Sequence, residues 1–111
     1  MSDDLRGKAA LVTGGGVGIG RATVEALAAA GAFVGIHHHT SVEGAEAALE
    51  LIRERGGDGM LLPADLTEPE QCRSLVDRFA EAAGRIDILV NNAGSPIERA
   101  KIEDCSFDLW K

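Results

Sequence analysis

Two short stretches of this sequence carry residue types that could do chemistry: a glycine cluster and a run of histidines. The first reads TGGGVGIG over residues 13–20, and the second reads HHHTS over residues 37–41. Glycines let a backbone turn sharply and approach a phosphate without a Cβ in the way. Imidazole N–H groups and hydroxyls can donate hydrogen bonds to a phosphate. Both stretches therefore predict the binding of a phosphate-bearing ligand.

A metal site and a purification tag are alternative explanations of the three histidines. If the run belongs to a β-strand, His37 and His39 share one side and His38 takes the other. Three zinc ligands have to converge on one point, which a straight strand does not allow. The run is also short and internal, unlike a tag. We therefore expect neither a metal nor a tag here.

Composition and charge set the broad class of the protein. The 111 residues, 45% of them hydrophobic, fit one domain with a modest core. No apolar run approaches the length of a membrane span, and no signal-peptide pattern is present. A net charge of −7 disfavours nucleic acid or a membrane as partner, because either would want a basic patch. Two cysteines are too few for a disulfide scaffold, so a cytoplasmic location is expected.

The hydrophobic pattern alternates between the strand period and the helix period. Apolar runs predict four strands, at 9–12, 33–37, 60–62 and 86–90. Helical spacing predicts three helices, at about 18–30, 41–55 and 68–83. Such alternation implies parallel strands joined by right-handed crossovers, in the order 3-2-1-4. The first strand then lies at the switch point of a doubly wound sheet, where a ligand should bind beside the glycine cluster.

The apolar positions also predict which helix faces are buried. The first helix repeats Ile19, Ala22, Thr23, Ala26, Leu27 and Ala30, and the second repeats Val42, Ala45, Leu49 and Ile52. Thr67 is expected to cap the third helix, with Glu70 three residues on. Cys72 shares a helical face with Leu75, Val76, Phe79 and Ala83, so we expect a core residue rather than a reactive thiol.

The spacing of the glycines narrows the class of nucleotide-binding fold. The generic pattern, with Gly at positions n, n+2 and n+5, is met in no register of this cluster. The pattern that fits is T-G-x-x-x-G-x-G, through Thr13, Gly14, Gly18 and Gly20. The helix that follows presents free N–H groups and a partial positive charge to an anion.

Four motifs together resemble the N-terminal half of a short-chain dehydrogenase/reductase of the classical type. They are TGGGVGIG, ADL at 64–66, NNAG at 91–94 and FDLW near the end, in matching order over essentially the whole chain. The resemblance implies an α/β Rossmann-type sheet, of which residues 1–111 are the N-terminal portion. It further implies that the full-length form is an NAD(P)-dependent oxidoreductase that interconverts an alcohol and a carbonyl by hydride transfer.

The resemblance also implies which residues bind the cofactor. The match to Asp65 accepts a hydrogen bond from the adenine amino group, although Asp65 could instead only start the helix. Asn91 helps to hold the central sheet, and a purely structural role is equally open for it. The expected cofactor-binding set is Thr13, Gly14, Gly16, Val17, Gly18, Ile19, Gly20, His38, His39, Thr40, Ser41, Asp65, Leu66, Asn91, Ala93 and Gly94.

The residue that ends the second strand bears on the choice of cofactor. An acid there hydrogen-bonds the ribose hydroxyls of NAD and would repel the 2′-phosphate of NADP. No acid occurs within residues 33–42, and His38 takes its place. His39 stands where phosphate-binding relatives often carry Arg, but neither His39 nor Val17 is Arg. NADP(H) is therefore favoured over NAD(H), and His37 is expected to be packed or solvated rather than a ligand.

Two other nucleotide-binding classes fit less well. Extended relatives of the epimerase type would need Gly where Val17 stands, and a methyltransferase would want an acid where His38 stands. Each of these two classes is disfavoured by the residue type at a single position.

In the family that the sequence resembles, catalysis uses a Ser and a Tyr-x-x-x-Lys pair. These residues lie beyond the position that matches Lys111, and this chain has no Tyr. The chain alone is therefore predicted to be inactive, and poorly stable because the strand at 86–90 would be an open edge. The full-length form is expected to act on a small carbonyl or alcohol as a homo-oligomer. The alternative is a stand-alone, non-catalytic dinucleotide-binding module.

Overall fold

The computed structural model describes residues 4–16 and 18–92. Strands and helices alternate along this part of the chain, as the hydrophobic pattern predicted. The elements are β1 (Ala9–Thr13), α1 (Gly18–Ala29), β2 (Phe33–His38), α2 (Val42–Glu54), β3 (Asp58–Pro63), α3 (Pro69–Ala83) and β4 (Ile88–Asn91). No helix within these ranges is long and apolar enough to cross a membrane.

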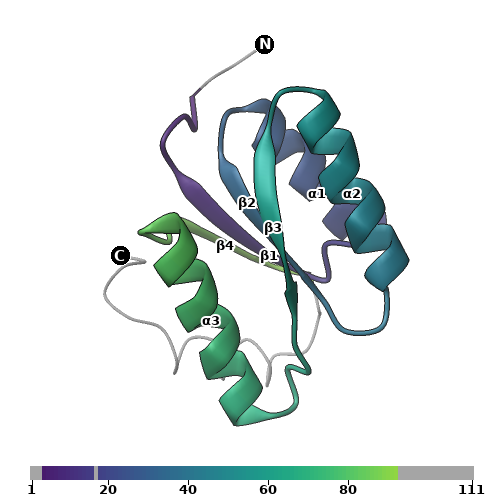
Figure 1. The fold of residues 1–111 in the computed structure, drawn as a ribbon, viewed down its shortest axis with the longest axis vertical. Coiled ribbons are helices and arrows are strands. Elements are labelled where there is room, and N and C mark those ends of the chain that lie inside the picture. The colour runs from purple at the N-terminus through teal and green to yellow at the C-terminus, as the bar shows by residue number, and fades with distance from the viewer. Residues whose placement is uncertain (1–3, 17, 93–111) are drawn as a thin grey trace.

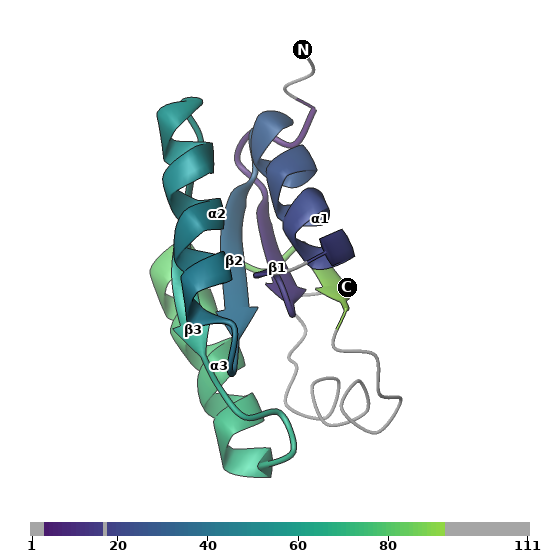
Figure 2. The ribbon, with the colours of Figure 1, turned by 90° about the vertical axis from the view of Figure 1, so that its right-hand side faces the viewer.

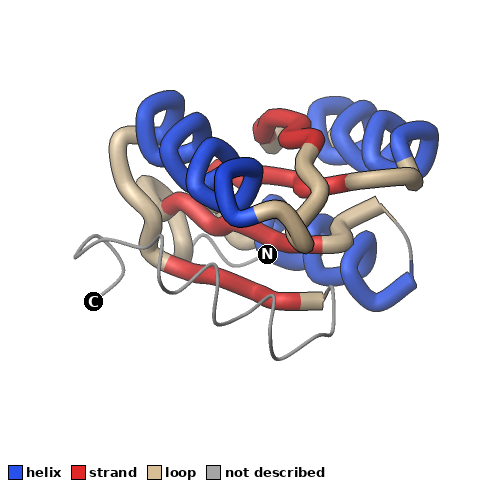
Figure 3. The backbone as a smooth tube through the Cα atoms, turned by 90° about the horizontal axis from the view of Figure 1, so that it is seen from below, coloured by secondary structure: helices blue, strands red, loops and turns tan. Residues whose placement is uncertain are grey.

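The four strands form one parallel sheet in the order β3-β2-β1-β4, which confirms the predicted topology. Helices α1 and α2 cover one face and α3 covers the other (Figure 1). In Figure 3 the strands lie as a layer between α3 and the pair formed by α1 and α2. Every residue of β1 is buried, as expected of a parallel strand covered on both faces. All four residues of β4 are only half-buried.

Each face of the sheet carries its own hydrophobic core. The core under α1 and α2 contains Ala10, Val12, Val24, Ala28, Ala32, Val34, Ile36, Ala45, Ala48 and Ile52. The core under α3 contains Ala9, Leu11, Leu62, Ala64, Leu66, Cys72, Leu75, Val76, Phe79 and Ile86. Cys72 is fully buried there, which confirms its prediction as a core residue.

The buried face of α1 differs from the expected one, although Leu27 packs against the core as its position predicted. Ile19 is 78% exposed and Ala22 and Ala26 are also exposed, whereas Gly20, Val24 and Ala28 face the sheet. The physical reason is that a glycine can approach the sheet more closely than an isoleucine can. On α2, Ala45 and Ile52 are buried as expected, but Val42 is 44% exposed at the first turn.

The predicted cap of α3 is also wrong. The N-cap residue is Glu68, with Pro69 following, and it makes no side-chain capping hydrogen bond. Thr67 instead donates its backbone N–H and its hydroxyl to Asp65 Oδ1, at 3.0 and 2.7 Å. The carboxylate therefore organises the turn that leads into the helix, because Asp side chains readily hydrogen-bond the backbone two residues on.

Phe79 is the largest fully buried side chain. Its ring stacks on Phe33 at 5.9 Å and fills the space above Gly35, where a Cβ would lie 2.7 Å from Phe79 Cδ1. We expect Phe79→Ala to lower the free energy of unfolding by about 3–5 kcal/mol, because the cavity cannot close fully. Urea denaturation measures this, with Asp77→Ala on the exposed side of the same helix as control. A loss no larger than that of the control would contradict the packing role of Phe79.

Candidate functional site

The carboxyl ends of β1, β2 and β3 surround a hollow of about 390 Å³. In Figure 2, β1 and β2 run downward towards this end of the sheet. The residues that line the hollow are Gly14, Gly16, His37, His38, His39, Thr40, Ser41, Asp65, Leu66 and Thr67. The fold therefore brings together the glycine cluster, the histidine run and the ADL motif, which lie far apart in the sequence. A second hollow, of about 480 Å³, lies at the opposite ends of β2 and β3, between the C-terminal ends of α1 and α2.

The glycine cluster is held closely by backbone from two helices. A Cβ on Gly20 would collide with the Gly14 carbonyl, so α1 can sit on the loop only without a side chain at this position. A Cβ on Gly16 would lie 2.8 Å from the Ser41 carbonyl and 2.9 Å from the Ala45 nitrogen. These contacts explain why the loop needs glycine at positions 16 and 20.

Gly18, the first residue of α1, faces open space instead. Its φ is +52°, which a side chain would strain, and a Cβ there would meet nothing within 4 Å. The open side of the loop thus lies at the helix N-terminus, where backbone N–H groups and the helix dipole favour an anion. Ile19 follows on the same exposed first turn.

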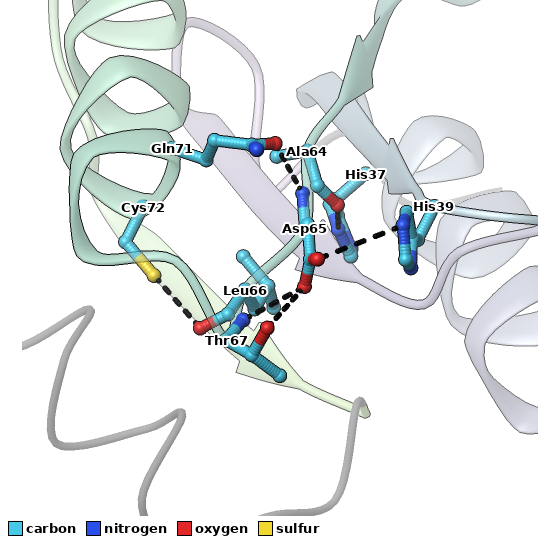
Figure 4. Close-up of polar contacts among 8 residues, drawn as sticks. All are labelled: His37, His39, Ala64, Asp65, Leu66, Thr67, Gln71 and Cys72. Atoms are coloured by element: carbon cyan, nitrogen blue, oxygen red, sulfur yellow. Dashed lines mark hydrogen bonds and ion pairs between the residues drawn. The ribbon is translucent and has the colours of Figure 1, made fainter.

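His37 connects two walls of the hollow through its ring. Nδ1 accepts a hydrogen bond from the Gly14 N–H at 2.9 Å, and Nε2 lies 2.9 Å from the Ala64 carbonyl (Figure 4). The residue is 4% exposed, and burial lowers the pKa of His37 below its ordinary value of 6.5. His37 is thus packed, as predicted, but its two hydrogen bonds were not foreseen.

His38 is the last residue of β2, and His39 follows the strand. His38 is 7% exposed; burial lowers the pKa of His38, and Glu46 on α2 opposes that shift. His38 Nδ1 is buried and has no hydrogen-bond partner among the described residues. His39 is far more exposed, with Nε2 3.9 Å from Asp65 Oδ2. Within the described part of the chain, no three His, Cys, Asp or Glu side chains are grouped to hold a metal ion.

Asp65 lies in the turn between β3 and α3. Besides accepting both hydrogen bonds from Thr67, it donates its own N–H to Gln71 Oε1 at 2.7 Å (Figure 4). The local structural role weighed for Asp65 is therefore present, and a contact with adenine stays a prediction. Leu66 is 4% exposed, and its carbonyl accepts a hydrogen bond from Cys72 Sγ. Leu66 thus anchors the turn in the core under α3.

Thr13 and Asn91 lie outside the hollow and join the central strands. The Thr13 hydroxyl donates to Asn91 Oδ1 at 2.9 Å and accepts from the Asn92 N–H at 3.0 Å, which ties β1 to β4. Asn92 Nδ2 is buried with no hydrogen-bond partner in the described ranges. The sequence reasoning chose Asn91 from the NNAG motif and missed Asn92. Asn92 stands out through a buried amide nitrogen with no hydrogen-bond partner among the described residues, and this feature can be seen only in the structure.

Thr40 and Ser41 line the hollow, as expected of ligand-binding hydroxyl residues. Ser41 is the N-cap residue of α2, yet its side chain makes no capping hydrogen bond. Three members of the expected set, Val17, Ala93 and Gly94, lie outside the described residues.

The residues present fit a ligand with a phosphate group and a flat polar end. The loop is open at Gly18, hydroxyls lie at the end of β2, and a buried imidazole nitrogen of His38 lacks a partner within the described part. The far wall carries the Asp65 carboxylate and the buried Leu66. An adenine dinucleotide has this combination of groups.

Comparison with known proteins identifies the family. Residues 8–111 match the short chain dehydrogenase family. An uncharacterized oxidoreductase of Methylorubrum extorquens is 43% identical over 107 residues, covering 96% of this chain and 43% of the relative. A short-chain dehydrogenase/reductase homolog of Bacillus subtilis is 40% identical over 86 residues, which is 78% of this chain and 79% of that protein.

The fold is also shared with a solved structure, a short chain dehydrogenase from Burkholderia cenocepacia J2315 in complex with NADP. The two are 49% identical with a TM-score of 0.79, over 83% of this chain and 38% of that one. The chain thus spans less than half the length of several relatives that it matches. The glycine loop, the parallel sheet and these matches lead to one conclusion: the chain belongs to the short-chain dehydrogenase family.

Proposed function

We propose that this chain is the N-terminal, cofactor-binding part of an NAD(P)-dependent oxidoreductase that interconverts an alcohol and a carbonyl. The observation that carries the proposal is the hollow at the carboxyl ends of β1, β2 and β3, onto which the glycine loop opens. In such an enzyme the bound nicotinamide ring supplies or accepts the hydride. The protein's part is to bind and orient the dinucleotide.

Different residues around the hollow are assigned to different parts of the dinucleotide. The pyrophosphate is assigned to the open side of the loop at Gly18 and to the first turn of α1. The adenosine ribose is assigned to the end of β2, beside His38 and Ser41. Adenine is assigned to the wall formed by Asp65 and Leu66. Both carboxylate oxygens of Asp65 face polar neighbours, with Oδ2 nearest to His39.

We further propose a preference for NADP(H) over NAD(H). Residues 33–42 contain no acid, so the end of β2 itself carries no carboxylate that would repel the 2′-phosphate. Buried His38 contributes a neutral imidazole near pH 7, because burial lowers the pKa of His38. The hydroxyls of Thr40 and Ser41 add donors. The Burkholderia relative with NADP bound is consistent with this preference.

A second candidate function is a stand-alone dinucleotide-binding module without catalysis. It is favoured by one observation: the Bacillus subtilis homolog is matched over 79% of its own length, so its size is close to that of this chain. Gene context separates the two candidates. An in-frame continuation past Lys111 that supplies Ser and Tyr-x-x-x-Lys would establish the oxidoreductase.

Gly18 should be required for cofactor binding. Gly18→Val places a branched side chain in the open space before α1, and we expect it to remove measurable binding of NADPH and NADH. Gly84→Val is the matched control, because Gly84 also has a positive φ of 81° and open space around its Cβ position, but lies at the far end of α3. Both variants should lose about 1–2 kcal/mol of stability from backbone strain. Undiminished affinity in folded Gly18→Val protein would refute the assignment.

His38 should control the choice between the two cofactors. His38→Asp restores the acid beside the ribose, and we expect the ratio of NADPH to NADH affinity to fall tenfold or more, about 1.4 kcal/mol or above. Dissociation constants for both cofactors near pH 6 and pH 8 test this. In the wild type the ratio should rise as the pH falls through the lowered pKa of His38, because a protonated histidine attracts the 2′-phosphate. A wild-type preference for NADH at both pH values would contradict the proposal.

Residues 1–111 expressed alone should not turn over substrate. We expect aggregation or self-association in size-exclusion chromatography, because half-buried β4 lies at an edge of the sheet. An assay of NAD(P)H oxidation over a panel of carbonyl compounds should show no activity. A well-behaved monomer that binds cofactor would favour the stand-alone module, and cofactor-dependent turnover would contradict both candidates.

A further inference from the structure

The ring of His37 lies between two loops that form opposite walls of the hollow. One nitrogen contacts the first residue of the glycine loop, Gly14. The other contacts Ala64, which precedes Asp65, as Figure 4 shows. Backbone hydrogen bonds accompany the ring on both sides. Gly15 N–H donates to the His37 carbonyl, and Ala64 N–H donates to the His38 carbonyl, both at 3.0 Å. The end of β2 is thus the point where the two loops are tied together.

The two partners of the ring permit only one protonation form. The Gly14 N–H can only donate, so Nδ1 has to present a lone pair. The Ala64 carbonyl can only accept, so Nε2 has to carry the proton. The other neutral tautomer would place two donors face to face at Gly14 and two acceptors at Ala64. The imidazolium ion keeps the Ala64 bond but turns Nδ1 into a donor that faces the Gly14 N–H.

We propose that His37 is a positioning residue, whose neutral Nε2–H ring clamps the glycine loop to the turn after β3 and releases the loop when the ring takes up a proton. The consequence for the cofactor rests on the function proposed above. Gly14 has a φ of +64°, and its carbonyl lies under Gly20 in the first turn of α1. Release of Gly14 would therefore disturb the loop at the place where the pyrophosphate is assigned.

The surroundings of the ring set the direction of its pH response. Burial is the main cause that lowers the pKa of His37; His38 and His39 lower it further, and the Ala64 carbonyl opposes them. Charged residues on the elements around the ring include Asp65 in the turn after β3, Arg78 on α3 and Glu46 on α2. Arg78 bonds the Pro63 carbonyl, and Glu46 acts on His38.

The sign of the response follows from this lowered pKa. Well above pH 6.5 the ring is neutral in both the folded and the unfolded chain, so the contribution of the clamp to stability is complete. As the pH falls below 6.5, the unfolded chain takes up a proton before the folded chain does, and this contribution is lost through the folded pKa. Cofactor affinity should fall over the same range, because the protonated ring no longer accepts from Gly14.

Two variants separate the two halves of the clamp. In His37→Asn the amide oxygen takes the place of Nδ1 and can still accept from Gly14. In His37→Gln the amide nitrogen takes the place of Nε2 and can still donate to Ala64. A ring that only filled space would be replaced better by the longer Gln than by the shorter Asn, which is the reverse of the order that the clamp predicts. The clamp predicts that they differ, and neither variant titrates.

The experiment measures NADH dissociation constants by fluorescence between pH 5 and pH 8, in the protein at its full natural length. NADH is used because it lacks the 2′-phosphate, so the charge on His38 and His39 has little to attract. Wild-type affinity should fall about tenfold as His37 titrates, which is the effect of one net hydrogen bond. At pH 8, His37→Gln should bind about tenfold more weakly than wild type, and His37→Asn should restore most of that loss. Both variants should give flat pH profiles.

His39→Asn serves as a second control. It removes an imidazole that lines the same hollow but is more than half exposed, and it leaves the clamp in place. The fall in NADH affinity at low pH should therefore persist in this variant. If the fall disappears with His39 instead of with His37, the assignment to His37 is wrong.

A measurement without cofactor separates this inference from the proposed function. In the unliganded protein, ¹⁵N chemical shifts of the His37 ring should show a proton on Nε2 alone, and the Gly14 amide signal should move as the ring titrates. If the wild type binds neither NADH nor NADPH at any pH, the proposed function fails, and these signals still decide the inference. A proton on Nδ1 at pH 8, a Gly14 amide that ignores the titration, or a flat wild-type NADH profile would overturn it.

Discussion

The seating of α1 on the end of β1 depends on a contact between two pieces of backbone. Gly20 lies so close to the Gly14 carbonyl that no side chain fits between them. This contact brings the first turn of α1 directly over the end of the most buried strand. The helix dipole, the open space at Gly18 and the hollow beside β2 all follow from that placement. It also turns Gly20, Val24 and Ala28 towards the sheet and leaves Ile19 in solvent.

Much of the fold could be predicted from the sequence, because continuous apolar runs separated by glycine-terminated helices leave few possible topologies. The strand order and the buried Cys72 were predicted for this reason. The buried face of α1 was not, because an apolar period ranks isoleucine above glycine and takes no account of how close the helix lies. Thr67 failed as a cap because α3 begins at Pro69 with Glu68 as the N-cap residue, which leaves Thr67 in the turn, where it donates to Asp65.

The candidate site, like the fold, could be predicted from the sequence only in part. The glycine loop, the end of β2 and the turn at Asp65 were expected to meet, since the carboxyl ends of parallel strands share one edge of the sheet. For the three adjacent histidines, the sequence could predict an alternation between the two sides of a strand, but not the environment of each ring. His37 is bonded at both ring nitrogens, His38 is buried with Nδ1 unpartnered among the described residues, and His39 is solvated. These differences arise partly from Gly14 and Ala64, which lie far from the histidines in sequence, and partly from α2, which follows them directly.

The glycine loop is held at three points within seven residues. His37 fixes its start at Gly14, the backbone of Ser41 and Ala45 encloses Gly16, and the Gly14 carbonyl supports Gly20. A chain held so closely has no slack to absorb an inserted or deleted residue. A change of one residue in length would rotate α1 by about 100° and bring a different side chain against the sheet. Over evolutionary time this segment can therefore vary by substitution at its outward positions, while its length has to stay constant.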